Sequence, residues 1–138
     1  MSASSDYLEL KLLDHVLGNT AFTQPANIYV ALFTASTNLE SNNPSAEVST
    51  SGTAYARQAV SFAAASSGSC ATDATVTFPV ATATYGTVTH IAIVDHVSNT
   101  NWGTGVNVLF YGALTASKQI DTNDQFIISS GNLTVTLA

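Results

Sequence analysis

The stretch Thr87–Val94, with the sequence TVTHIAIV, decides the fold class. Its residues alternate between two sides, and each side carries apolar members: Val88, His90, Ala92 and Val94 on one, Thr89, Ile91 and Ile93 on the other. A period of two is the spacing of side chains along a β-strand. Threonine, valine and isoleucine are also enriched in strands. We therefore predict a strand at 87–94, with His90 a hydrogen-bonded residue inside or at the rim of a sheet.

Further strands are predicted from the same alternation or from short apolar runs: Ile28–Phe33, Tyr55–Phe62, Ala74–Phe78, Val106–Leu114, Gln125–Ser129 and Leu133–Leu137. Turn-forming residues separate these runs, and no helical pattern lies between them. Such an order favours antiparallel pairing. We predict an all-β fold: one antiparallel β-sandwich domain, jelly-roll-like, spanning residues 1–138. The strand 28–33 is apolar on both faces, so it should lie centrally in its sheet.

One amphipathic helix is predicted before the first strand, at residues 6–17. Asp6 is the expected N-cap, with Glu9 three residues on, and Gly18 is expected just past the C-terminus. An apolar stripe runs along this helix: Leu8, Leu12 and Val16, widened by Leu10, Leu13 and Leu17. A stripe of this kind must be buried on the domain's own sheet or on a partner. We expect packing on the domain's own sheet.

A long polar segment, residues 35–54, follows the strand 28–33. It contains Asn42-Asn43-Pro44 and Ser51-Gly52, and its only charged residues are Glu40 and Glu47. Loops of this length are uncommon in compact domains and usually functional or disordered. We predict a surface loop that a neighbouring chain holds in place, and that is mobile in the isolated protein because ordering a backbone costs about 1–2 kcal/mol per residue.

Charge and composition restrict the classes of partner. Charged residues make up 9% of the chain, and three basic residues face nine acidic ones, whereas an ordinary soluble domain is about 25% charged. Nucleic acid and anionic membrane surfaces both require clustered lysine and arginine. We therefore expect neither as a partner, and no membrane span or signal peptide. Serine and threonine supply about a quarter of the residues, a weakly charged surface that suits contact with other subunits and a homo-oligomer.

The residues that could carry chemistry favour a protein that is not an enzyme and holds no cofactor or metal. The sequence contains neither a G-x-S-x-G elbow nor an H-E-x-x-H motif nor a phosphate-binding glycine loop. Asp95-His96 is the most site-like pair, but adjacent strand residues point to opposite faces. The acids at Asp121 and Asp124 lie in a turn, where Asp caps the local backbone. Cys70 is alone, so no internal disulfide is expected.

Five residues are candidates for an assembly interface: Arg57, Tyr55, Glu40, Asn43 and Trp102. Arg57 is the most informative, since it is one of two basic residues beyond the helix. It is either a rim arginine paired with a nearby acid or an interface anchor, a role in which arginine and tyrosine are enriched. We also expect it to anchor the 35–54 loop.

The chain resembles a family of small bacteriophage virion proteins. Blocks in the same order carry the resemblance: Asp6–Glu9, Lys11–Gly18, Ile28–Thr34, Tyr55–Val60, Val76–Pro79, Tyr85–His90 and Leu109–Leu114. Residues 35–54 and the region of Trp102 are longer than the family pattern. Members are often labelled tail fiber proteins, and others fit capsid decoration. The resemblance implies a component of the virion, made in the cytoplasm of the bacterial host.

Two functions follow, and a third is weaker. The leading expectation is a capsid decoration or cement protein that stabilises the head by contacts with the major capsid protein. The alternative is a tail or tail-fibre-associated protein, an adaptor or receptor-binding tip among other tail proteins. Copy number would separate the two. A carbohydrate-binding module would need an exposed aromatic platform, for which Trp102, Tyr85 and Tyr111 are the candidates.

Overall fold

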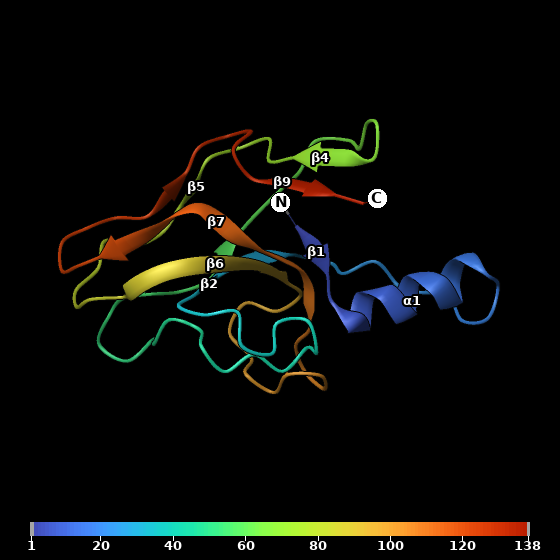
Figure 1. Ribbon diagram of the computed structural model, residues 1–138, viewed down its shortest axis with the longest axis horizontal. Coiled ribbons are helices and arrows are strands. Elements are labelled where there is room, and N and C mark those ends of the chain that lie inside the picture. The colour runs from blue at the N-terminus through green and yellow to red at the C-terminus, as the bar shows by residue number, and fades with distance from the viewer. Residues whose placement is uncertain (1, 138) are drawn as a thin grey trace.

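A computed structural model describes residues 2–137 of the chain and shows a mainly β fold built around one antiparallel sheet (Figure 1). The five strands of this sheet lie in the order β1 (Ala3–Ser4), β7 (Val108–Ile120), β6 (Gly86–Val94), β2 (Tyr29–Phe33) and β3 (Gln58–Ala59). The predicted antiparallel all-β class is confirmed. The strand predicted to be central, β2, has neighbours on both sides, β6 and β3.

The second layer consists of two short ribbons. These are β4 (Ser69–Ala71) with β9 (Thr134–Thr136), and β5 (Val76–Thr77) with β8 (Ile127–Ile128). They cover one face of the main sheet, above it in Figure 1. Val76, Ile128 and Val135 from the ribbons pack with Leu32 and Ile91 from the sheet in the larger of two apolar cores.

The opposite face of the main sheet is covered by loops. Residues 35–54 and 95–107 run beneath the sheet in Figure 1. They enclose the smaller core, which consists of Ala31, Phe33, Leu39, Ala92, Val94, Val106 and Val108. The fold is therefore layered from strand ribbons, a sheet and irregular loops, with an apolar core on each side of the sheet.

The loop of residues 35–54 is held by its own chain. Leu39, Asn42 and Val48 are buried. The Val48 amide donates to the Leu32 carbonyl at 2.9 Å, and Glu47 pairs with Phe33 in an isolated antiparallel bridge. These contacts are intramolecular, whereas the sequence suggested that a neighbouring chain would supply them.

An irregularity in the pairing of β6 with β7 makes the predicted faces of β6 partly wrong. The pairing of β6 with β7 shifts register between Val88 and His90. Val88 therefore joins Ile91 and Ile93 in the larger core, and not Ala92 on the opposite face. Strict alternation is wrong here, because the regular pleat of β6 is interrupted where its register with β7 shifts between Val88 and His90, and the residues before and after the shift no longer alternate in phase.

Several predicted strand boundaries are also wrong. The predicted strand Tyr55–Phe62 pairs with β2 only at Gln58–Ala59. β4 begins at Ser69, where no strand was predicted, and β7 continues past Leu114 to Ile120 along β6. These lengths depend on which partner backbone is within hydrogen-bonding reach, and single-strand patterns do not contain that information.

Helix α1 (Asp6–Val16) is confirmed at both ends to within one residue, but its N-cap is Ser5 and not Asp6. The Ser5 hydroxyl accepts from the Leu8 amide at 3.3 Å and donates to the Val108 carbonyl. It thus caps the helix and ties it to β7 at once. Gly18 adopts a φ of +79° past the C-terminus, and the Asn19 amide donates to the Asp14 carbonyl at 2.8 Å. This left-handed termination was predicted from the glycine.

The prediction that the apolar stripe of α1 packs on the domain is wrong for most of its residues. Leu8 is buried and Leu12 is half-buried, and both contribute to the larger core. The remaining four residues are 57–76% exposed: Leu10, Leu13, Val16 and Leu17. Figure 1 shows the reason, since α1 starts beside β1 and projects away from the sheet, so that only its first turns reach the body of the protein.

Candidate functional site

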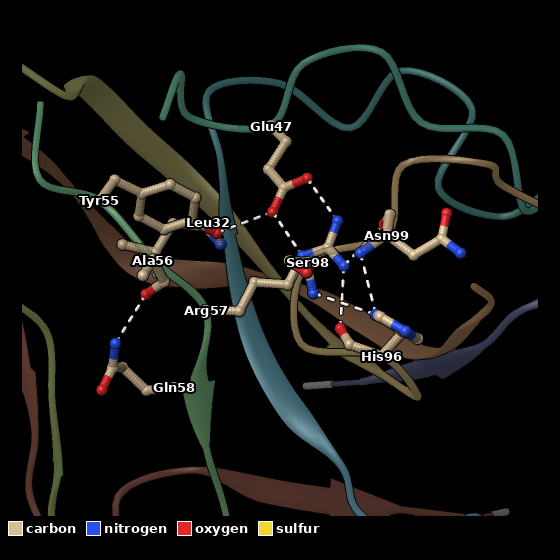
Figure 2. A network of polar contacts seen from close by, with 9 residues as sticks. All are labelled: Leu32, Glu47, Tyr55, Ala56, Arg57, Gln58, His96, Ser98 and Asn99. Atoms are coloured by element: carbon tan, nitrogen blue, oxygen red, sulfur yellow. Dashed lines mark hydrogen bonds and ion pairs between the residues drawn. The ribbon is translucent and has the colours of Figure 1, made fainter. Parts of the chain in front are cut away.

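The centre of the polar interior is Arg57. Its side chain is 3% exposed. Nε and Nη2 donate to the two carboxylate oxygens of Glu47 at 2.7 and 2.8 Å, and Nη1 donates to the carbonyls of His96 and Asn99 at 2.9 and 3.0 Å (Figure 2). A planar guanidinium suits this bidentate geometry, which a lysine could not reproduce. One side chain thus joins the 35–54 loop to the 95–107 loop.

Tyr55 extends the same network into the core. Its hydroxyl donates to Glu47 Oε1 at 2.9 Å and accepts from the Leu32 amide at 3.0 Å. Its ring stacks on Phe78, with centroids 6.1 Å apart. Burial, and then the Glu47 carboxylate, raise the pKa of Tyr55 well above its ordinary value. The phenol is therefore a fixed hydrogen-bond donor, protonated throughout the physiological range.

Trp102 closes the outer side of the network. The Arg57 guanidinium carbon lies 4.9 Å from the centroid of the Trp102 ring, a cation–π distance. The same ring packs at 6.4 Å from Phe33 in the smaller core. Trp102 is half-buried, so it shields the ion pair from solvent and holds the 95–107 loop against the sheet.

A second set of hydrogen bonds fastens the two loops beside the first. Asp95 accepts from the Asn107 amide at 2.6 Å and from its side-chain nitrogen at 2.8 Å. Asn42 donates to the Asn107 side-chain oxygen at 2.9 Å and accepts from the Val108 amide at 2.7 Å. Asn42 therefore occupies a place that a neighbouring strand would otherwise fill.

The pair Asp95-His96 is used for loop structure. His96 Nδ1 accepts from the amides of Ser98 and Asn99 at 3.1 and 2.9 Å, so it caps the turn that presents two carbonyls to Arg57. Within residues 2–137, every buried side-chain nitrogen or oxygen has a hydrogen-bond partner. In the same residues, no group of three or more His, Cys, Asp or Glu side chains is arranged to hold a metal ion.

The structure brings three of the five candidate interface residues together. Arg57, Tyr55 and Trp102 form one network, whereas Glu40 and Asn43 are exposed elsewhere on the 35–54 loop. The Glu40 carbonyl accepts from the Asp6 amide at 2.9 Å, at the start of α1. Sequence reasoning missed Glu47 as the partner of Arg57, although it is one of only two acids in that loop and so the nearest available counter-charge.

A cavity of about 200 Å³ lies between the main sheet and β9. Its lining residues come from β6, β7 and the C-terminal segment, together with Ser2, and Tyr111 is the only ionisable side chain among them. The lining residues include no His, Cys, Asp, Glu or Lys side chain. The residues of the Arg57 network are not among those that line this cavity.

The sequence matches, over residues 3–136, a protein family described as podophage GP4 fiber I protein gp80. The chain belongs to this family. Curated proteins gave no match to the sequence. The family places the chain among the structural proteins of the bacteriophage virion, of the tail-fibre type, and implies association with other virion proteins.

Membership of the fiber I family gives the network its context. In this fiber protein the buried charges, aromatic rings and turn caps all join segments of one chain. Among the residues described, α1 is the sole helix, and it is too short and too polar to cross a membrane. These contacts fix the two long loops, 35–54 and 95–107, to the main sheet.

Proposed function

We propose that this protein is a non-enzymatic structural subunit of a phage tail fibre, acting as a compact adaptor domain among other tail proteins. The match to the fiber I family carries this proposal, because it spans 3–136 and leaves almost no part of the chain outside it. The description of the family names a fibre. It therefore favours the tail over capsid decoration, which the sequence alone had put first.

The interior suits a rigid connecting subunit. The Arg57–Glu47 pair, with Tyr55 and Trp102, locks two loops that would otherwise be free to move over the sheet. Removing that freedom in the unbound protein lowers the entropic cost of assembly, since the loops need not be ordered on contact. A subunit with fixed loops holds its neighbours in a defined position relative to one another.

The exposed parts of the candidate set are the proposed contact points. Glu40 and Asn43 are exposed on the 35–54 loop, and Trp102 on the 95–107 loop is half-buried. The Arg57 network joins this loop to the 95–107 loop and so restricts the movement of both. In this proposal Arg57 and Tyr55 do not touch the partner, and they act as positioning residues that hold the loops. The partners are tail proteins of the same phage or further copies of this chain.

The test is the location and copy number of the chain in purified particles. Heads and tails are separated after release of the genome, and the chain is quantified in each fraction against the major capsid protein by mass spectrometry. We expect it in the tail fraction, in far fewer copies than the major capsid protein. Recovery with heads, in numbers comparable to the capsid protein, would establish decoration instead.

A further inference from the structure

Helix α1 carries a second apolar stripe that the protein leaves uncovered. Leu10, Leu13 and Leu17 are spaced by three and four residues and are exposed. At 3.6 residues per turn they share a face roughly opposite Leu8, the residue that anchors the helix in the core. The spacing is that of anchors which insert from a helix into a groove. The helix is thus apolar on two faces, and only one of them is used within the chain.

The charges around this stripe are of one sign. Glu9 and Asp14 flank it on the helix, and Asp6 lies at its N-terminal end. The two basic side chains of α1 are engaged elsewhere: Lys11 Nζ lies 5.7 Å from the ring centroid of Tyr7, and His15 Nδ1 accepts from the Phe22 amide at 3.0 Å.

Acidic character continues from the helix onto the body of the protein. The Asp6 amide bonds the Glu40 carbonyl, which brings the 35–54 loop beside the base of the helix. The pKa of Tyr111 is raised, first by burial and then by the carboxylates of Glu40, Asp6 and Glu9. The exposed stripe therefore lies beside a negatively charged surface.

A second copy of the chain fits this surface poorly. Two such helices would face each other with carboxylate against carboxylate, in a protein whose formal net charge is −6. The helix has 11 residues, so it is only about 16 Å long and about 10 Å wide. Its outward face is well short of the roughly 800 Å² that each partner buries in a stable complex. A groove that wraps the helix and reaches its base covers more surface than a flat helix pair.

We propose that Leu10 and Leu13 of α1, with Leu17 at its C-cap, insert into an apolar groove of another virion protein whose rim carries lysine and arginine. This proposal deepens the proposed function and rests on it for the source of the partner. The leucines supply the apolar contact, and Glu9 and Asp14 pair with the basic rim and set the orientation. Attachment is consequently weakened by salt, which screens rim charges more than buried apolar contacts.

The test supplies the full chain in trans to a phage that lacks its gene, and measures copies of the chain per purified particle. The variant Leu10→Gln, Leu13→Gln, Leu17→Gln should reduce incorporation at least about tenfold, because burying even one leucine is worth roughly that factor in affinity. The matched control replaces three apolar residues that are about half-exposed elsewhere, Val80→Gln, Val97→Gln and Ile127→Gln. The control should be incorporated like the wild type.

Charge is tested separately by washing particles at increasing salt. Glu9→Gln with Asp14→Asn should dissociate at a lower salt concentration than the wild type. Circular dichroism and melting of each purified variant establish that it is folded. If the triple variant does not fold, Leu13→Gln alone, at a site 57% exposed, provides the incorporation measurement.

Two results would overturn the proposal. One is equal incorporation of a folded leucine variant and the wild type. The other is a wild-type dimer in sedimentation equilibrium that the leucine substitutions abolish, because the stripe would then bind a second copy. Neither result decides whether the protein belongs to the tail fibre. If the wild type is found in head fractions and the leucine substitutions remove it from them, the docking role of α1 stands and the tail location is rejected.

Discussion

Replacing Arg57 with methionine should destabilise the protein more than any surface substitution. Methionine fills much of the arginine volume but donates no hydrogen bond. The Glu47 carboxylate, with its side chain 17% exposed, keeps only the Tyr55 hydroxyl as a partner. The carbonyls of His96 and Asn99 lose the donor that both share.

The expected magnitude follows from this loss of partners. Removing one member of a buried ion pair costs about 3–5 kcal/mol, because the other charge stays buried and uncompensated. The total free energy of unfolding of a domain is about 5–15 kcal/mol. Arg57→Met should therefore remove about a fifth or more of the stability. Arg57→Lys should fall between the wild type and Arg57→Met, since lysine keeps the charge but loses the bidentate contact.

Urea unfolding followed by tryptophan fluorescence is a suitable assay, because Trp102 is the only tryptophan and lies on the Arg57 guanidinium. The midpoint should fall with little change in the m-value, as expected when stability alone changes. Lys118→Met is the matched control, because Lys118 is exposed on β7. It should change the free energy of unfolding by less than about 0.5 kcal/mol.

The double variant Arg57→Met with Glu47→Leu makes the reasoning refutable. Without either charge the desolvation penalty disappears, so the pair of substitutions should cost clearly less than the sum of the single ones. A cost below about 1 kcal/mol for Arg57→Met would show that the network contributes little beyond a surface ion pair. Strict additivity in the double variant would show that the two side chains do not act as a unit.

Leu8→Ala should cost about 2–5 kcal/mol of unfolding free energy, as for other buried leucines. Leu13→Ala should cost less than about 0.5 kcal/mol, because its side chain is exposed. Comparable losses of the two variants in chemical unfolding would show that the two faces of α1 are misassigned. Asn42→Ala should cost about 1–3 kcal/mol, because the buried amide of Val108 loses its acceptor, and faster hydrogen exchange at that amide is the direct readout. The pKa of Tyr55 is raised by burial and by Glu47, so above about pH 10 the unfolded chain releases a proton that the folded chain retains. Stability should then be constant through neutral pH and fall as pH rises past about 10, and Tyr55→Phe should reduce the slope in melting experiments; an unchanged slope would remove Tyr55 as its cause.

The sequence by itself determined the strands that carry apolar residues on both faces. Thr87–Val94 and Ile28–Phe33 correspond to β6 and β2 almost residue for residue, because burial on both faces selects β-branched and apolar residues at every position. It also determined the helix and its glycine stop, since capping and periodicity are local properties. The short strands β1 and β4 have two or three residues, which is too few for a period to appear.

Only the tertiary structure decided where those elements go and what their side chains meet. The sequence marked Arg57 as unusual, but its partner Glu47 lies 10 positions away along an irregular loop, and its carbonyl acceptors lie 39 and 42 positions away. The apolar residues of α1 are equally apolar on both faces in the sequence, and the direction in which Ser5 ties the helix to β7 determines which face is buried. Local patterns record how a residue suits its own backbone, whereas burial and ion pairing depend on distances between segments that only the folded chain brings together.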